Sequence, residues 1–112
     1  MLTPGDVVEL DLGLPAGSEA GLRRPAGVVT AQRILKGGPN VIQVVPLTRR
    51  VRRSSTEVTI DPDADNRLAA RSSARCQHVR SVATARIHRR TGNIGPVALS
   101  EIRETLALLL DL

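Results

Sequence analysis

The sequence predicts an α+β fold that is mainly β, a small barrel or rolled sheet closed by one C-terminal helix. Short runs rich in Val, Ile and Thr are separated by Gly- and Pro-containing turns along residues 5–82, which is typical of a small all-antiparallel sheet. Near Leu99 the apolar spacing changes from two residues to the three or four of a helix. The 112 residues suffice for one domain, spanning residues 1–112, and not for two.

The first half of the chain predicts four strands. Residues 5–12 alternate imperfectly between apolar and polar side chains, as in a half-buried strand. Residues 14–24 are rich in turn formers and predict a long loop, of the kind that often carries function. A short β-branched strand is expected within residues 25–32, the strongest strand at residues 41–48, and another at residues 54–60.

The second half of the chain predicts further strands and then the helix. Residues 67–82 predict one or two strands, for a total of about five to seven. Residues 89–92 predict a turn beside a solvated His88. Pro96 suits a first helical position and Gly95 the cap before it. The apolar face of that helix is formed by Leu99, Ile102, Leu106, Leu109 and Leu110.

Aromatic residues and paired cysteines are both missing from the composition. With no Phe, Trp or Tyr, the core must be aliphatic, and RNA-binding folds that stack bases on aromatic side chains are disfavoured. The single Cys76 excludes an intramolecular disulfide and is expected to pack as a small hydrophobe. Because only His78 and His88 could add nitrogen ligands, neither a structural metal nor another cofactor is expected.

No segment resembles a targeting or membrane-spanning sequence. The N-terminus lacks a charged start followed by an apolar stretch, and the longest strongly apolar run, residues 106–110, is too short to cross a bilayer. A cytoplasmic protein without membrane contact is therefore expected. Its small size favours stabilisation as a dimer.

Positive charge is concentrated in the middle of the chain. The net charge is +5, and residues 49–90 hold eleven cations and four anions, beginning with the basic run at residues 49–53. Such a cluster indicates a polyanionic partner, with a merely solvated surface as the alternative. Fifteen of the sixteen cations are arginine, whose planar fork suits phosphate or carboxylate recognition.

Two segments could carry chemistry. Ser18 and Glu19, followed by Arg24, place a hydroxyl, a carboxylate and a guanidinium on one loop that leads into a strand. These groups can serve as base, acid and charge clamp, and a capped turn is the alternative interpretation. Thr48 ends the strongest predicted strand, where it could also be a simple β-former.

The motifs that combine into a pattern are, in order, Gly5-Asp6-Val7-Val8, Asp11-Leu12, Gly17-Ser18-Glu19, Arg24-Pro25-Ala26-Gly27-Val28-Val29, Pro46-Leu47-Thr48 and Val79-Arg80-Ser81-Val82. In order and spacing they resemble the MazF/PemK-type toxins, the ribonuclease halves of bacterial toxin–antitoxin pairs. The resemblance implies an SH3-like β-barrel homodimer that cleaves single-stranded RNA at short sequences without a metal, leaving a 2′,3′-cyclic phosphate and a 5′-hydroxyl. It also implies a cognate antitoxin whose disordered acidic and apolar tail occupies the basic groove.

The same resemblance implies catalytic roles for Arg24 and Thr48, with Glu19 as a third candidate. Cleavage needs a base for the 2′-hydroxyl proton, a clamp for the charge on the phosphate and an acid for the departing oxygen. Because arginine stays charged at neutral pH, Arg24 is expected mainly to stabilise the phosphate, while Thr48 hydrogen-bonds a phosphate oxygen. Glu19 suits the base, or equally orders its loop by pairing with Arg23 or Arg24.

Further RNA contacts are expected from side chains near these positions. His78 lies where many family members carry glutamine, which favours a base contact or a structural role over a proton shuttle. The first strand has Val8, Glu9 and Leu10 where family members usually place an aromatic residue, so stacking would fall to arginine planes. The expected RNA-binding residues are Ser18, Arg23, Arg49, Arg50, Gln77, His78 and Arg80.

Two other functions compete with cleavage of RNA. A non-enzymatic poison of DNA gyrase, of the CcdB type, acts through a C-terminal tryptophan-containing tail, and this chain has no tryptophan. A small barrel that binds RNA or a ribosomal protein without cutting would have a similar composition. It would not explain why Glu19, Arg24 and Thr48 occur together in their motifs.

Overall fold

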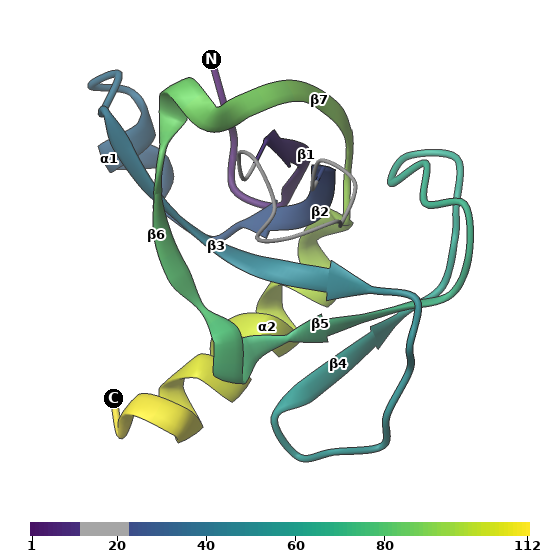
Figure 1. Cartoon of the computed structure of the whole chain (residues 1–112). Helices are drawn as coiled ribbons and strands as arrows, with labels where there is room; N and C mark the ends of the chain where they lie inside the picture. Colours follow the sequence, from purple (N-terminus) through teal and green to yellow (C-terminus); the bar gives the residue numbers. More distant parts are fainter. Residues whose placement is uncertain (12–22) are drawn as a thin grey trace, which may run out of the picture.

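The computed structural model, which describes residues 1–11 and 23–112, folds into one strongly bent antiparallel sheet with a long C-terminal helix (Figure 1). Its strands follow the order β4-β5-β3-β2-β1-β7, and β6 pairs with β3. The described elements are β1 Asp6–Asp11, β2 Arg23–Val28, α1 Gln32–Leu35, β3 Val41–Thr48, β4 Glu57–Ile60, β5 Ser72–Arg75, η1 Cys76–His78, β6 Arg80–Ala83, η2 Thr84–Arg86, β7 Ile87–Asn93 and α2 Gly95–Leu110. The predicted mainly β, barrel-like fold with a closing helix is confirmed.

β3 is the strand around which the sheet rolls. Its residues 41–44 pair with β6, its residues 44–46 pair with β2, and its last two residues pair with β5. Three partners on one strand force the sheet to curl, and the segment from β6 to β7 curves around β1 and β2 (Figure 1). The strand order ends at β4 and β7, so the roll is barrel-like rather than a closed cylinder in the part of the chain described.

Two aliphatic clusters fill the molecule, one on each face of the central strands. Because side chains alternate along a strand, Val7 and Val45 face one cluster while Val8 and Val44 face the other. Burying each of these side chains fully stabilises the fold by about 1.5–3 kcal/mol. α2 packs on β4 and η1. Its Ile102 belongs to the first cluster and has no exposed surface. An aliphatic core is therefore sufficient for this sheet.

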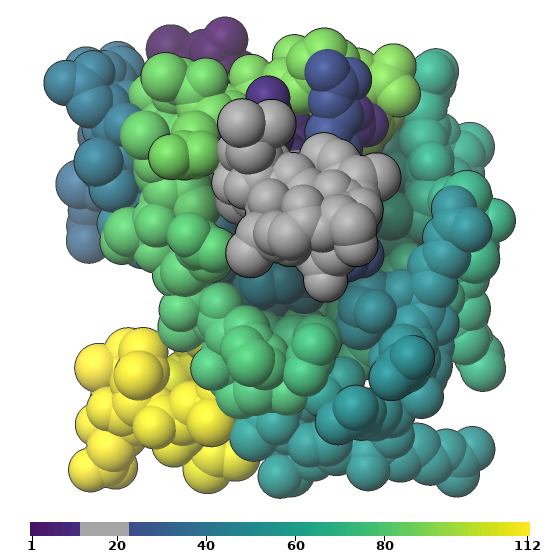
Figure 2. Space-filling view, in the orientation of Figure 1, coloured from purple at the N-terminus to yellow at the C-terminus, as the bar shows by residue number. Residues whose placement is uncertain are grey.

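α2 begins one residue earlier than predicted, with Ile94 rather than Gly95 at its N-cap, and it ends in exposed leucines. Pro96 lies in its first turn, and the backbone N–H of Gly95 donates a hydrogen bond to Asn93 Oδ1. Its C-terminal end projects from one corner of the molecule (Figure 2), where Leu108 is 70% exposed and Leu110 56%. Among the described residues, no helix has the length and apolar character needed to span a membrane.

The predicted turn at residues 89–92 is wrong, because these residues belong to β7. This strand pairs with β1, and its two cations reach carboxylates of β1: Arg90 Nε lies 2.8 Å from Asp6 Oδ1 and Arg89 Nε lies 3.5 Å from Glu9 Oε2. Gly92 has a steric function, since a Cβ there would lie 2.5 Å from the backbone oxygen of Asn66. The glycine thus permits close packing and does not mark a turn.

Candidate active site

A cleft of about 460 Å³ opens where β2 and β3 separate. The last pair in their ladder is Ala26 with Pro46, and continuing this register by two residues places Arg24 opposite Thr48. Pro25 and Pro46 have no N–H to extend the ladder, and β3 pairs with β5 from this point on. The cleft is lined by Leu10, Arg24, Pro25, Ala26, Val44, Pro46, Leu47, Thr48, Arg50, Arg52, Arg75 and Arg80.

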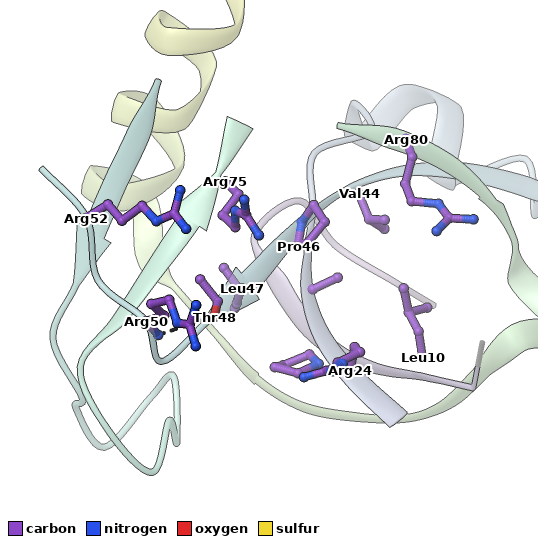
Figure 3. Close-up of a pocket in the computed structure, with 12 residues that line it drawn as sticks. Leu10, Arg24, Val44, Pro46, Leu47, Thr48, Arg50, Arg52, Arg75 and Arg80 are labelled. Atoms are coloured by element: carbon purple, nitrogen blue, oxygen red, sulfur yellow. Dashed lines mark hydrogen bonds between the residues drawn. The ribbon is translucent and has the colours of Figure 1, made fainter. Parts of the chain in front are cut away.

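Thr48 and Arg24 occupy two sides of this cleft. Figure 3 shows Arg24 on β2 and, across from it, Thr48 beside Arg50. The backbone N–H of Arg50 donates to Thr48 Oγ1 at 3.2 Å, which fixes the hydroxyl oxygen at the end of the strand. The hydroxyl hydrogen can then be donated to a ligand. A guanidinium and an alcohol therefore face a common space that admits a phosphate.

The cleft has a strongly positive lining. Five of its lining residues are arginines, and no aspartate or glutamate is found among the described residues that line it. Arg50, Arg52 and Arg75 gather at one end, and Arg80 lies at the other (Figure 3). A concave surface with one sign of charge concentrates its field and attracts polyanions. The arrangement is suited to holding a phosphodiester chain.

Comparison with known proteins identifies the family. Residues 3–110 match the family model described as "PemK-like, MazF-like toxin of type II toxin-antitoxin system". The chain belongs to this toxin family. It is 32% identical over 116 residues to endoribonuclease MazF9 of Mycobacterium tuberculosis, a match covering 100% of this chain and 98% of that protein.

Solved structures of related toxins share the fold of this PemK/MazF-like toxin. The MazE–MazF structure (Form-II) from Deinococcus radiodurans superposes with a TM-score of 0.80 at 28% identity, covering 99% of this chain and 96% of that one. An endoribonuclease in complex with its cognate antitoxin from Mycobacterial species also gives a TM-score of 0.80, at 20% identity, covering 100% of this chain and 97% of that one.

Four of the predicted site residues of the toxin meet in the cleft: Arg24, Thr48, Arg50 and Arg80. Two others, Ser18 and Glu19, lie outside the described residues. Arg52 and Arg75 line the cleft without having been assigned from the sequence. Arg52 belongs to the basic run at residues 49–53, which could have suggested it, whereas no motif marks Arg75.

Arg49, Gln77 and His78 are exposed but do not line the cleft, although the sequence suggests RNA contacts for them. Arg23 is also outside the lining, because its guanidinium lies on the side of β1 and β7. Its Nη1 is 3.0 Å from His88 Nε2 and 3.8 Å from a carboxylate oxygen of Glu9. Since arginine can only donate, His88 accepts through Nε2 and is not simply solvated as expected.

A buried carboxylate lies behind the arginines of the cleft. The side chain of Glu57 is only 2% exposed, and it accepts hydrogen bonds from Ser73 Oγ and Gln77 Nε2, both at 2.7 Å. Burial alone would raise the pKa of Glu57, but these bonds and the positive charges of Arg75 and Arg52 hold it below its usual range. Glu57 is therefore ionised at neutral pH.

Asp6 and Cys76 are structural rather than part of the cleft. Burial opposes the ionised form of Asp6, yet hydrogen bonds from Thr3, Arg90 and Asn93 leave the pKa of its carboxyl below the ordinary value. Cys76 is fully buried in the core, as predicted, and burial raises the pKa of its thiol to about 11. The described residues form no group of three or more His, Cys, Asp or Glu side chains that could hold a metal ion.

Proposed function

We propose that this toxin is a sequence-specific endoribonuclease that cleaves single-stranded RNA without a metal, by attack of a 2′-hydroxyl on the adjacent phosphate. The observation that carries the proposal is the meeting of Arg24 and Thr48 across an arginine-lined cleft. The two residues lie on consecutive strands, and the register of β2 and β3 brings them together. Family membership and the related endoribonuclease MazF9 support the same activity.

The cleft supplies the groups that would stabilise the reacting phosphate. The guanidinium of Arg24 stabilises the charge that develops on the phosphate oxygens, and Thr48 donates its hydroxyl hydrogen to one of them. The described lining holds no carboxylate or imidazole that could accept the 2′-hydroxyl proton. We therefore assign that role to Glu19, whose segment joins β1 to β2 and so precedes Arg24 in the chain. As the 2′-oxygen bonds to phosphorus, the bond between phosphorus and the 5′-oxygen breaks and the departing oxygen takes a proton from solvent. The products are a 2′,3′-cyclic phosphate and a 5′-hydroxyl.

The proposed partners follow from the same surfaces. A cognate antitoxin with an acidic, partly disordered tail would fit the positive cleft, and the related Deinococcus radiodurans structure contains MazE with MazF. We also propose a homodimer, since a domain of this size gains stability by association and α2 exposes several leucines. We also propose a cytoplasmic location, where an RNA substrate is available.

The proposed activity predicts discrete cleavage of single-stranded RNA in the presence of EDTA. Purified protein incubated with mixed-sequence RNA should give fragments with 2′,3′-cyclic phosphate ends, because no step of the proposed reaction uses a metal ion. End-group analysis by mass spectrometry checks the result. RNA that is bound but remains intact would favour the non-cleaving barrel, and inhibition of DNA gyrase without cleavage would favour the gyrase poison.

Removing the hydroxyl of Thr48 is expected to lower kcat about 10- to 100-fold, because one hydrogen bond to a charged phosphate oxygen is lost. The variant Thr48→Val keeps the β-branched shape, and Thr48→Ser, which keeps the hydroxyl, should retain most of the activity. Thr59→Val provides the matched control on an exposed position of β4. Single-turnover cleavage rates measure the effect, and equal rates for Thr48→Val and wild type would remove Thr48 from the mechanism.

A further inference from the structure

We propose that Glu57 is a positioning residue that holds Arg75 in place, and that Arg75 and Arg52 form a second phosphate-binding subsite beside the pair Arg24 and Thr48. This inference rests on the proposed function and specifies how the cleft would hold a neighbouring phosphate of the same RNA. Glu57 itself does not line the cleft, so it would act through Arg75, which does.

Strand register places Glu57 and Arg75 next to the candidate catalytic threonine. Glu57 is directly opposite Arg75 in the β4–β5 ladder, and Ser73 of β5 is directly opposite Thr48 of β3. Directly opposed residues share a face of a sheet, and so do residues two apart on one strand. All four side chains therefore belong to one face of the β3–β5–β4 sheet, while Ala74 between them belongs to the core.

The contacts of Glu57 make it a rigid anchor. Its Oε1 accepts from Ser73 and its Oε2 accepts from Gln77, so both oxygens are held in place. Its side chain is only 2% exposed, so the carboxylate presents almost no surface to solvent or to a ligand. The amide nitrogen of Gln77 is thus engaged in fixing this carboxylate, which gives Gln77 a structural task beside the cleft.

The distance between Glu57 and Arg75 allows Glu57 to attract and position the guanidinium without forming a hydrogen bond to it. Arg75 Nε lies 3.9 Å from Glu57 Oε2, which is close enough for a strong electrostatic attraction and too long for a hydrogen bond. Glu57 therefore does not use the N–H donors of Arg75. The side chain of Arg75 is 33% exposed and lines the cleft, so its planar fork can bind a phosphate.

A buried anion also offsets the repulsion within the arginine group. Arg50, Arg52 and Arg75 gather at the same end of the cleft (Figure 3). Arginines that share one end of a cleft repel one another unless a negative charge lies nearby. Because Glu57 lies behind this end of the cleft rather than in its lining, it attracts the guanidiniums without making the lining negative. This separates the anchor from the phosphate site.

The opposite hypothesis is that Glu57 only weakens the positive field of the cleft. The two hypotheses predict opposite effects of Glu57→Gln, which removes the charge and keeps an oxygen that can accept from Ser73. If Glu57 positions Arg75, RNA binding weakens when the charge is removed. If Glu57 only lowers the field, RNA binding strengthens, because the cleft gains net positive charge.

The test is binding of a short mixed-sequence RNA with 2′-O-methyl riboses, which cannot be cleaved through a 2′-hydroxyl, measured by fluorescence anisotropy over a range of salt concentrations. Both Glu57→Gln and Arg75→Ala should raise Kd roughly tenfold and lower the slope of log Kd against log salt by about one phosphate contact. Adding Glu57→Gln to Arg75→Ala should produce no further change. Asp61→Asn removes an equal charge from an exposed pair with Arg71 outside the cleft and serves as the control.

A tighter Kd or a steeper salt slope for Glu57→Gln would overturn the inference, and so would full additivity with Arg75→Ala. Circular dichroism of each variant checks that the fold is retained, and Arg75→Ala tests the subsite even if Glu57→Gln is unfolded. The result is independent of the proposed cleavage. If wild type fails to cut natural RNA but the coupling is observed, the subsite stands and the enzymatic proposal falls, whereas cleavage without coupling removes only the subsite.

Discussion

Replacing Arg24 by alanine is expected to lower kcat for RNA cleavage by about 10²–10³-fold, the usual cost of losing one charge-stabilising donor at a reacting centre. Arg24 is exposed at the edge of the cleft, just beyond the last pair of the β2–β3 ladder. Its side chain is therefore not needed for the core, and the fold should be retained. Single-turnover rates, with circular dichroism and thermal unfolding of the same samples, measure both properties.

Two further variants serve as comparisons for Arg24→Ala. Arg33→Ala removes the same charge from an exposed position in α1, outside the cleft lining, and should cleave at the rate of wild type. Arg24→Lys keeps the charge and loses the planar fork, so its rate should lie between those of wild type and Arg24→Ala. A wild-type rate for Arg24→Ala would exclude Arg24 from the chemistry and remove the main support for the proposed mechanism.

Replacing Asp6 by asparagine is expected to lower the free energy of unfolding by about 2–3 kcal/mol. The fully buried carboxylate accepts from the backbone and hydroxyl of Thr3 and from Asn93, and it pairs with Arg90. Asparagine would turn an NH₂ group toward some of these donors. Because the network joins the N-terminal turn to β7, its loss loosens one edge of the roll. Urea unfolding at neutral pH measures the change.

The pH dependence of stability gives a second measure of Asp6. Its pKa in the folded protein is below the ordinary 3.8, so its stabilising effect is fully present well above that pH and is lost as the pH falls through the lower, folded value. Wild type should therefore lose more stability on acidification than Asp6→Asn. Glu57 and Asp61 also have lowered pKa values, so the difference between the two proteins isolates Asp6. Equal urea midpoints at neutral pH would contradict the structural role.

Local patterns were sufficient for the elements that depend on local physics. β3 spans the predicted residues 41–48, since a run rich in Val and Ile favours an extended strand. α2 follows from helical spacing and an early proline. The sequence does not predict β7, because this segment is a strand through its pairing with β1. There Asp6 and Glu9 form ion pairs with the arginines of β7. Nothing within residues 89–92 indicates that distant pairing.

In the candidate site, too, some residues are predicted by local patterns and others are found only in the structure. Sequence motifs indicated Arg24 and Thr48, while Arg75 and Glu57 carry no motif and are recognised only through the register of β4, β5 and β3. The expected role of Arg49 follows from the basic run at residues 49–53, and those of Gln77 and His78 follow from a stretch that approaches the RNA groove in the family that the chain resembles. Proximity along the chain does not determine which side of a sheet a residue reaches, so the structure leaves these three outside the cleft lining.

The sequence by itself determined the composition and the family of this toxin. Its core is aliphatic without aromatic residues, its cations are almost all arginine, and the family pattern extends along nearly the whole chain. Only the tertiary structure decided between the neighbours Arg23 and Arg24, which were both candidates for RNA contact. Because successive side chains of a strand point to opposite faces, Arg23 meets Glu9 and His88 while Arg24 reaches the cleft opposite Thr48. That choice depends on strand pairing between distant segments, which no local pattern specifies.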